Sequence, residues 1–281
     1  MIIEGRCITV DNNKNNKKDY KKNLLLGISL ALLLFSLVGL GFRWRDQYNN
    51  EQAVEEARKI ARESRESESE DFYQQDAITI GWEREATDEA PKEALPFIQE
   101  LQEKNPEVVG WIEVAGTEID YPVVQAEDNE FYLKRDWLGQ DNSAGAIFMD
   151  YRNDPLGLEE RKTHTILYGH HRQDGSMFQN LMNYKDEAYF RENPTFEVTD
   201  QYGTHTFEIF SVYVTSIDFY FIETRFPEDE DFEVFLDSII ERRKFDSDVK
   251  VSAEDHLLTL STCTYEYDDA RFVVHARRVE E

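Results

Sequence analysis

One uncharged apolar run near the N-terminus constrains this chain more than any other feature. Residues 24–42 read LLLGISLALLLFSLVGLGF, which as a helix is long enough to cross the hydrocarbon core of a bilayer. The run has no polar face, so it suits a soluble core poorly. A cleaved signal peptide is the alternative, but its apolar part is usually shorter, and no small-x-small cleavage site clearly follows. We therefore expect an uncleaved transmembrane anchor at residues 24–42.

The charges on either side of the run predict its orientation. Five lysines precede it, namely Lys14, Lys17, Lys18, Lys21 and Lys22, whereas only Arg43 and Arg45 follow it closely. Positive charge collects on the cytoplasmic side of a membrane span. The sequence therefore predicts a single-pass protein of the cell membrane, with residues 1–23 in the cytoplasm and the remainder extracellular.

Residues 43–95 are rich in Glu, Arg, Ser and Gln and predict an acidic stalk, part helical and part flexible. Residues 50–70 have helical propensity, charges of both signs and few large apolar side chains. Such a segment is typical of a solvated spacer. We expect it to lift a domain off the membrane and not to be a core element.

From residue 96 the sequence predicts one mainly β domain, 96–281. A short helix is expected at 96–104, followed by β-branched and aromatic runs separated by turn residues. These runs lie at 108–114, 119–125, 144–150, 164–170, 205–217, 257–263 and 271–279. Helical spacing of apolar residues interrupts them at 175–191 and 229–244. Together they indicate a closed β-barrel with helices inserted between strands.

Charge and cysteine content exclude several classes of function. The net charge of -27 argues against a nucleic-acid partner, because phosphate binding needs clustered Lys and Arg. The two cysteines, Cys7 and Cys263, fall on opposite sides of the apolar run, so we expect no disulfide between them. No His, Cys and acid cluster has zinc-like spacing, so neither a metal nor another cofactor is expected.

Three expected strand ends carry residues that together suit acyl transfer. The strand at 257–263 ends in Cys263, the next strand opens with Arg271, and a strand far upstream ends near His170. A thiol becomes a good nucleophile beside a base, His passes protons near neutral pH, and Arg can stabilise an oxyanion. From spacing alone other interpretations stay open: a buried structural thiol, a surface histidine, or an arginine paired with Asp268 or Asp269.

At these residues the sequence resembles the sortase family. TLSTC at 259–263 is similar to the TLxTC signature, Arg271 follows at the family interval, and YGHH at 168–171 is similar to the segment with the catalytic histidine. Three further landmarks follow the family order: VVGWIEVAGTEIDYPVVQ, GAIFMDYRN and GSMFQNL. The likeness covers roughly residues 96–281. The helices at 229–244 and 96–104 resemble those of class B.

The resemblance implies an eight-stranded sortase barrel and a cysteine transpeptidase of a Gram-positive cell surface. Cys263 would attack the Thr carbonyl of a sorting signal of the NPxTx or xPxTG type. His170 would protonate the departing amine and deprotonate the incoming one, and Arg271 would steady the oxyanion. The thioacyl enzyme would pass the surface protein to a peptidoglycan amine. Thr262, Tyr168 and Ser261 are further candidates for substrate contact.

His171 competes with His170 for the catalytic role. Neighbouring residues on a strand point to opposite faces, so His170 is assigned to the site and His171 to its rim. His164, His205, His256 and His275 are interpreted as structural or surface positions.

Three other functions remain open from the sequence. They are a secreted cysteine protease that uses water as acceptor, a sortase that polymerises pilins, and a surface adhesin without enzymatic activity.

Overall fold

The computed structural model describes residues 12–76, 94–155, 158, 163–264, 266–267 and 269–279. Within the range 12–76, it describes side chains only for residues 21–67. The expectations for Cys7, Asp268 and residues 77–93 lie outside these ranges. The chain forms two compact units, Met1–Tyr48 and Asn49–Glu281. The second unit carries the barrel.

The apolar run is part of a long helix, α1 (Asn12–Asp76). Within the described residues, this is the one helix long and apolar enough to cross a membrane. Its large apolar side chains are exposed along the run, with Phe35 79% exposed. Trp44 and Tyr48 stack just beyond it, with ring centroids 5.8 Å apart. A helix with this surface suits a membrane interior; its orientation stays a prediction.

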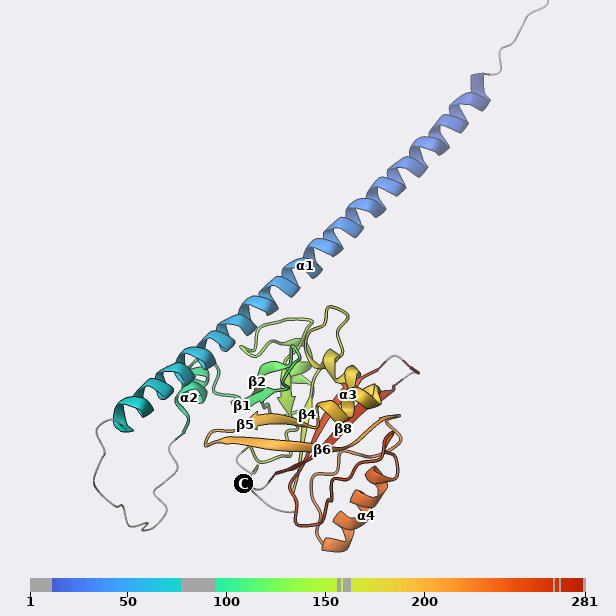
Figure 1. The fold of residues 1–281 in the computed structure, drawn as a ribbon. Coiled ribbons are helices and arrows are strands. Elements are labelled where there is room, and N and C mark those ends of the chain that lie inside the picture. Colours follow the sequence, from blue (N-terminus) through green and yellow to red (C-terminus); the bar gives the residue numbers. More distant parts are fainter. Residues whose placement is uncertain are drawn as a thin grey trace, which may run out of the picture. The chain divides into compact units, whose positions relative to one another are not determined.

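The second unit is built on a closed barrel of eight strands in the order β1-β2-β3-β4-β7-β8-β6-β5 (Figure 1). β2 runs parallel to β3 and β4 parallel to β7, and the other pairs are antiparallel. The strands are β1 (Val108–Glu113), β2 (Asp120–Val124), β3 (Ile147–Met149), β4 (His164–Tyr168), β5 (Thr195–Thr199), β6 (Thr204–Thr215), β7 (Leu257–Cys263) and β8 (Arg271–Arg278). The mainly β prediction is confirmed, although β5 was not among the predicted strands.

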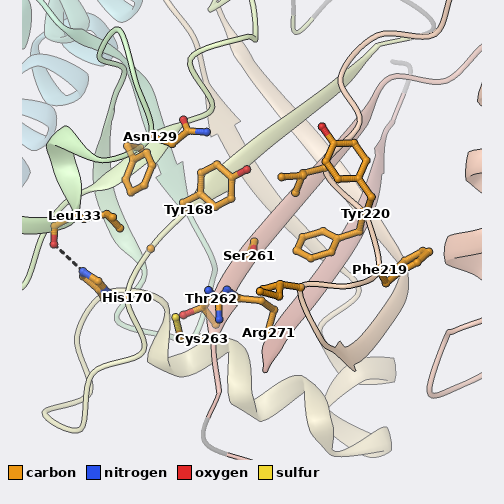
Figure 2. Close-up of a pocket in the computed structure, with 15 residues that line it drawn as sticks. Asn129, Leu133, Tyr168, His170, Phe219, Tyr220, Ser261, Thr262, Cys263 and Arg271 are labelled. Carbon is orange, nitrogen blue, oxygen red and sulfur yellow. Dashed lines mark hydrogen bonds between the residues drawn. The ribbon is translucent and has the colours of Figure 1, made fainter. Parts of the chain in front are cut away.

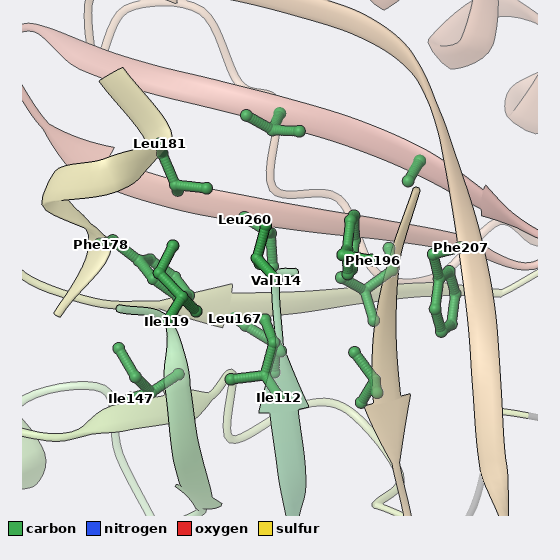
Figure 3. Packing of buried hydrophobic residues seen from close by; sticks show 14 of the residues in the cluster. Ile112, Val114, Ile119, Ile147, Leu167, Phe178, Leu181, Phe196, Phe207 and Leu260 are labelled. Carbon is green, nitrogen blue, oxygen red and sulfur yellow. The ribbon is translucent and has the colours of Figure 1, made fainter. Parts of the chain in front are cut away.

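Apolar side chains from the inward face of each strand fill the barrel. Figure 3 shows Ile112, Leu167 and Leu260 meeting there, all fully buried. On β7, Leu258 and Leu260 belong to this interior cluster, whereas Leu257 belongs to the cluster beneath the helix α4 (Asp229–Ile240). The alternation has the two-residue period of a strand covered on both sides.

Short helices precede β1 or connect later strands. They are α2 (Pro96–Lys104), η1 (Phe131–Lys134), η3 (Phe178–Lys185), α3 (Glu187–Glu192) and α4 (Asp229–Ile240). The predicted helices at 96–104, 175–191 and 229–244 are present, the last ending at Ile240. α4 packs Phe232, Phe235 and Ile239 against the outside of β6, β7 and β8, and a capping box at Glu228 and Asp231 begins it.

The prediction that residues 50–70 are not a core element is wrong for the helical turns at 53–61. Ala53, Ala57, Ile60 and Ala61 are buried against α2 and β1. Trp137 donates a hydrogen bond to the Ala53 carbonyl at 2.8 Å. Alanines at helical spacing let this helix pack closely against α2 and β1. Because the face has few large apolar side chains, the sequence pattern did not reveal it.

Ala57 offers a test of this packing. It is 0% exposed, so Ala57→Asp buries a carboxylate without a partner. We expect the unfolding free energy to fall by about 2–4 kcal/mol, measured by urea denaturation. Gln52→Asp adds the same charge at an exposed position of the same helix and serves as the control. Equal stability of the two variants would contradict the packing.

A chain of buried hydrogen bonds crosses four strands beneath α4. His164 on β4 donates from Nδ1 to the Glu223 carbonyl at 2.6 Å, and since a carbonyl only accepts, the other ring nitrogen of neutral His164 is an acceptor. It receives the Thr259 hydroxyl at 2.6 Å, and Thr259 in turn accepts from His275 Nδ1 at 2.6 Å. Tyr213 donates to His275 Nε2 at 2.7 Å. With both histidines neutral, each ring nitrogen and hydroxyl in this series of hydrogen bonds has a partner.

Burial therefore makes protonation of these histidines unfavourable. It lowers the pKa of His164 to about 4 and holds the pKa of His275 well below 6.5. The expectation that His164 and His275 are structural is confirmed, as it is for buried His256 and for His205, which pairs with Asp200 at 3.0 Å.

The neutral histidines predict a stability slope in mild acid. As pH falls below 6.5, the unfolded chain binds protons at His164 and His275. In the folded chain His164 stays neutral down to about pH 4, and the pKa of His275 is also held well below 6.5. The unfolding free energy therefore falls as pH falls, by about 1.4 kcal/mol per pH unit for each proton. His164→Gln reduces the slope by about one proton in urea titrations at several pH values. A wild-type slope that His164→Gln leaves unchanged would contradict the assignment.

Candidate active site

A cleft of about 310 Å³ opens on the outside of the barrel where β4, β7 and β8 lie side by side (Figure 2). Most of its lining is apolar. The lining residues are Asn129, Leu133, Phe148, Tyr168, Gly169, His170, Ile217, Phe219, Tyr220, Phe221, Ile222, Ser261, Thr262, Cys263 and Arg271. All three residues that the sequence predicted to carry chemistry are among them.

Strand register brings these three residues together. Cys263 and Arg271 face each other in the last pair of the antiparallel β7–β8 ladder. Parallel pairing of β4 with β7 sets Tyr168 opposite Ser261, so His170 and Cys263 each lie two residues beyond that pair. Neighbouring strands are about 4.8 Å apart. The thiol, the imidazole and the guanidinium therefore originate from three adjacent strand ends.

A carbonyl on η1 holds the His170 ring. Its Nε2 donates a hydrogen bond to the Leu133 carbonyl at 2.7 Å, which Figure 2 shows as a dashed line. Because the carbonyl only accepts, Nε2 carries the proton, and Nδ1 holds the lone pair in the neutral ring.

Two glycines next to this histidine have no room for a side chain, and only Gly145 lies against its ring. A Cβ on Gly145 would lie 2.9 Å from His170 Cδ2 and 3.0 Å from the Leu133 oxygen, and the φ of Gly145 is 66°. A Cβ on Gly169 would lie 2.5 Å from Ile147 Cδ1. Neither position has space for a side chain.

His171 is not among the residues that line the cleft. Its ring interacts with the backbone of Cys263. Burial lowers the pKa of His171 and nearby Lys185 adds to this, whereas the hydrogen bond to Cys263 opposes it. His171 thus contacts the main chain of Cys263 from outside the cleft.

Arg271 donates a hydrogen bond to the Ala270 carbonyl at 3.2 Å, and no acidic residue in the described part of the chain pairs with it. Glu266, an acid close to Arg271 in the sequence, forms an ion pair with Lys185 at 2.6 Å instead. Lys185 also donates to the Thr264 hydroxyl at 3.1 Å. The guanidinium therefore keeps most of its donors for the cleft.

The three candidates for substrate contact differ in their exposure. Tyr168 is half-buried, and its hydroxyl donates to Asp150 at 2.9 Å. Ser261 and Thr262 line the cleft but are only 3% and 2% exposed. Among these, Tyr168 presents the largest surface to a ligand.

One wall of the cleft was missed by the sequence interpretation. Residues 217–222 follow β6 and contribute Ile217 and Tyr220, which are 57% and 53% exposed. The signal was an aromatic run, DFYFI at 218–222, between a strand and a helix. Large apolar side chains without a strand or helix to bury them indicate a binding surface.

Comparison with known proteins identifies the family of this chain. The family model of the sortase domain matches residues 112–279. Sortase B of Listeria monocytogenes is 36% identical over 260 residues, which cover 92% of this chain and 96% of that protein. The chain belongs to the sortase family.

Solved structures agree on the class. A Bacillus anthracis protein similar to sortase B matches with a TM-score of 0.68 at 38% identity, over 83% of this chain and 97% of that chain. A Staphylococcus aureus sortase B–substrate complex matches with a TM-score of 0.62 at 35% identity, over 67% and 87% of the two chains. The protein is a class B sortase and, as such, a cysteine transpeptidase, so the adhesin alternative is excluded.

Gly145 provides a test of how the cleft holds His170. Gly145→Ala introduces strain at positive φ and pushes a methyl group into the imidazole. Gly139 has a φ of 76° with nothing within 4 Å of its Cβ position, so Gly139→Ala reproduces the strain without the contact. We expect about a hundredfold lower kcat/KM for Gly145→Ala than for Gly139→Ala. Equal losses in peptide-cleavage assays would show that only backbone strain matters.

Proposed function

We propose that the protein is a membrane-anchored sortase that cleaves a C-terminal sorting signal of the NPxTx or xPxTG type and joins the Thr carbonyl to a peptidoglycan amine. The observation that carries the proposal is that Cys263, His170 and Arg271 line one mostly apolar cleft. An extended peptide fits such a cleft, with its apolar side chains on the wall at 217–222 and its Thr carbonyl near the thiol.

Cleavage begins with the thiol of Cys263. Its proton passes to His170 Nδ1, the atom left free by the hydrogen bond from Nε2 to Leu133. The sulfur attacks the Thr carbonyl carbon, and Arg271 donates to the oxyanion that forms. The C–N bond then breaks as His170 returns the proton to the departing amine, which leaves a thioester on Cys263.

Transfer reverses these steps with a new amine. The incoming amine attacks the thioester carbon and gives its proton to His170, and Arg271 again stabilises the oxyanion. The C–S bond breaks, the new amide leaves, and Cys263 recovers its proton. Tyr168, Ser261 and Thr262 line the same cleft and complete the proposed peptide contacts.

The apolar surface of residues 24–42 supports the anchoring part of the proposal. We assign residues 1–23 to the cytoplasm and the catalytic domain, 96–281, to the outer face of the membrane. There the domain would meet both surface proteins and peptidoglycan precursors.

The proposal predicts a product that depends on Cys263. Quenched peptides carrying NPQTN-like, SPxTG-like and LPxTG-like motifs are incubated with the protein and a glycine or diaminopimelate-type amine, and mass spectrometry follows the products. We expect a thioacyl adduct and an amine-joined peptide. Cys263→Ala lowers both by about a thousandfold or more. Ser252→Ala, an exposed change outside the cleft, serves as the control.

The products also separate the alternatives. Hydrolysis alone in abundant amine would indicate the secreted cysteine protease. Joining to a pilin lysine in preference to a peptidoglycan-type amine would indicate the pilin-polymerising sortase. The absence of any Cys263 adduct with all three peptides would overturn the proposed function.

A further inference from the structure

The wall of the cleft at residues 217–222 belongs to no strand or helix. Tyr220 nevertheless stands at the edge of the cleft with its side chain 53% exposed. A loop that presents large apolar groups to water needs other contacts to keep its shape. Polar groups outside the cleft supply those contacts.

Arg152, just after β3, reaches this wall with two hydrogen bonds. One terminal nitrogen donates to the Tyr220 hydroxyl and the other to the Ile222 carbonyl, both at 2.8 Å. The two acceptors lie 68 and 70 residues further along the chain. Arg152 thus fixes both the main chain of the wall and its most exposed aromatic ring.

Asp150 holds the arginine in place. The carboxylate is 0% exposed and receives Arg152 Nε and a terminal nitrogen, each at 2.8 Å. Burial alone would raise the pKa of Asp150, but the hydrogen bonds from Arg152 and its other donors bring it below the ordinary value. A paired, planar guanidinium of this kind has little freedom to move.

The same carboxylate also holds the opposite side of the cleft. Asp150 Oδ2 accepts from Asn129 Nδ2 and from the Tyr168 hydroxyl, both at 2.9 Å. Asn129, Tyr168 and Tyr220 all line the cleft, whereas Asp150 and Arg152 do not. One ion pair with a fully buried carboxylate therefore joins these two parts of the cleft, and both its members lie in the GAIFMDYRN segment.

We propose that Asp150 and Arg152 are positioning residues that hold the 217–222 wall in the shape that binds the peptide. The inference rests on the proposed function, because it takes the sorting-signal peptide as the ligand. Substrate affinity depends on this pair, whereas the reactivity of the Cys263 thiol does not. The pair acts on the cleft from behind and touches no reacting atom.

The test separates peptide binding from thiol chemistry in the full chain. Arg152→Met keeps most of the side-chain volume but loses the hydrogen bonds. With whichever quenched peptide wild type cleaves, we expect KM to rise about tenfold and kcat to change less than twofold. The rate of Cys263 alkylation by iodoacetamide without peptide stays unchanged, while about tenfold more peptide is needed to protect the thiol.

Two further variants distinguish positioning from general stability. Arg152→Lys keeps the charge but cannot bridge Asp150 and the wall, so we expect it to behave like Arg152→Met. Tyr220→Phe removes one of the two acceptors of Arg152. In the double variant with Arg152→Met, we expect Tyr220→Phe to raise KM by less than it does alone. Arg191→Met, which removes an exposed ion pair on α3, serves as the control.

Each outcome bears on one proposal. Unchanged KM and unchanged peptide protection in Arg152→Met would overturn the positioning role while leaving the proposed function intact. Equal losses of kcat and of thiol alkylation would also overturn it, because they indicate a general structural effect. If wild type forms no Cys263 adduct, the proposed function itself fails. Should Arg152→Met not fold, Arg152→Lys and Tyr220→Phe carry the same comparison.

Discussion

The register between β4, β7 and β8 is the constraint on which the rest of the structure depends. Side chains alternate along β7 between the barrel interior, where Leu260 is buried, and the outer face, where Cys263 lines the cleft. A slip of one residue would turn the thiol inward and Leu260 outward. Packing of the barrel therefore fixes the position of the chemical groups, and the helices need only cover the outer face.

Different interactions fix the strand ends that carry Cys263 and Arg271 and the cleft wall at 217–222. The side with Cys263 and Arg271 is held by continuous ladders of main-chain hydrogen bonds, which tolerate many side chains. The wall at 217–222 has no ladder and relies on particular groups. Arg152 supplies hydrogen bonds on one flank, and Arg242 lies 3.6 Å above the Phe219 ring on the other.

This difference explains what could be predicted from the sequence. Seven of the eight strands, the inserted helices and the strand ends that carry His170, Cys263 and Arg271 follow from local patterns and from short motifs, whereas β5 was not predicted. The buried face at 53–61 and the cleft wall depend on partners far along the chain, such as Trp137 for Ala53. Local periodicity contains no information about such contacts, and small or irregularly spaced apolar residues give a weak signal.

The Asp150–Arg152 pair is costly in free energy, since the Asp150 carboxylate has no exposed surface and loses its hydration, while Arg152 stays partly exposed. Replacing such a pair with apolar side chains often leaves stability unchanged or improved. Its hydrogen bonds, however, have fixed directions, and apolar packing could not hold the Tyr220 hydroxyl and the Ile222 carbonyl in the same way. The pair therefore makes better sense as a device that defines the shape of the cleft than as a source of stability.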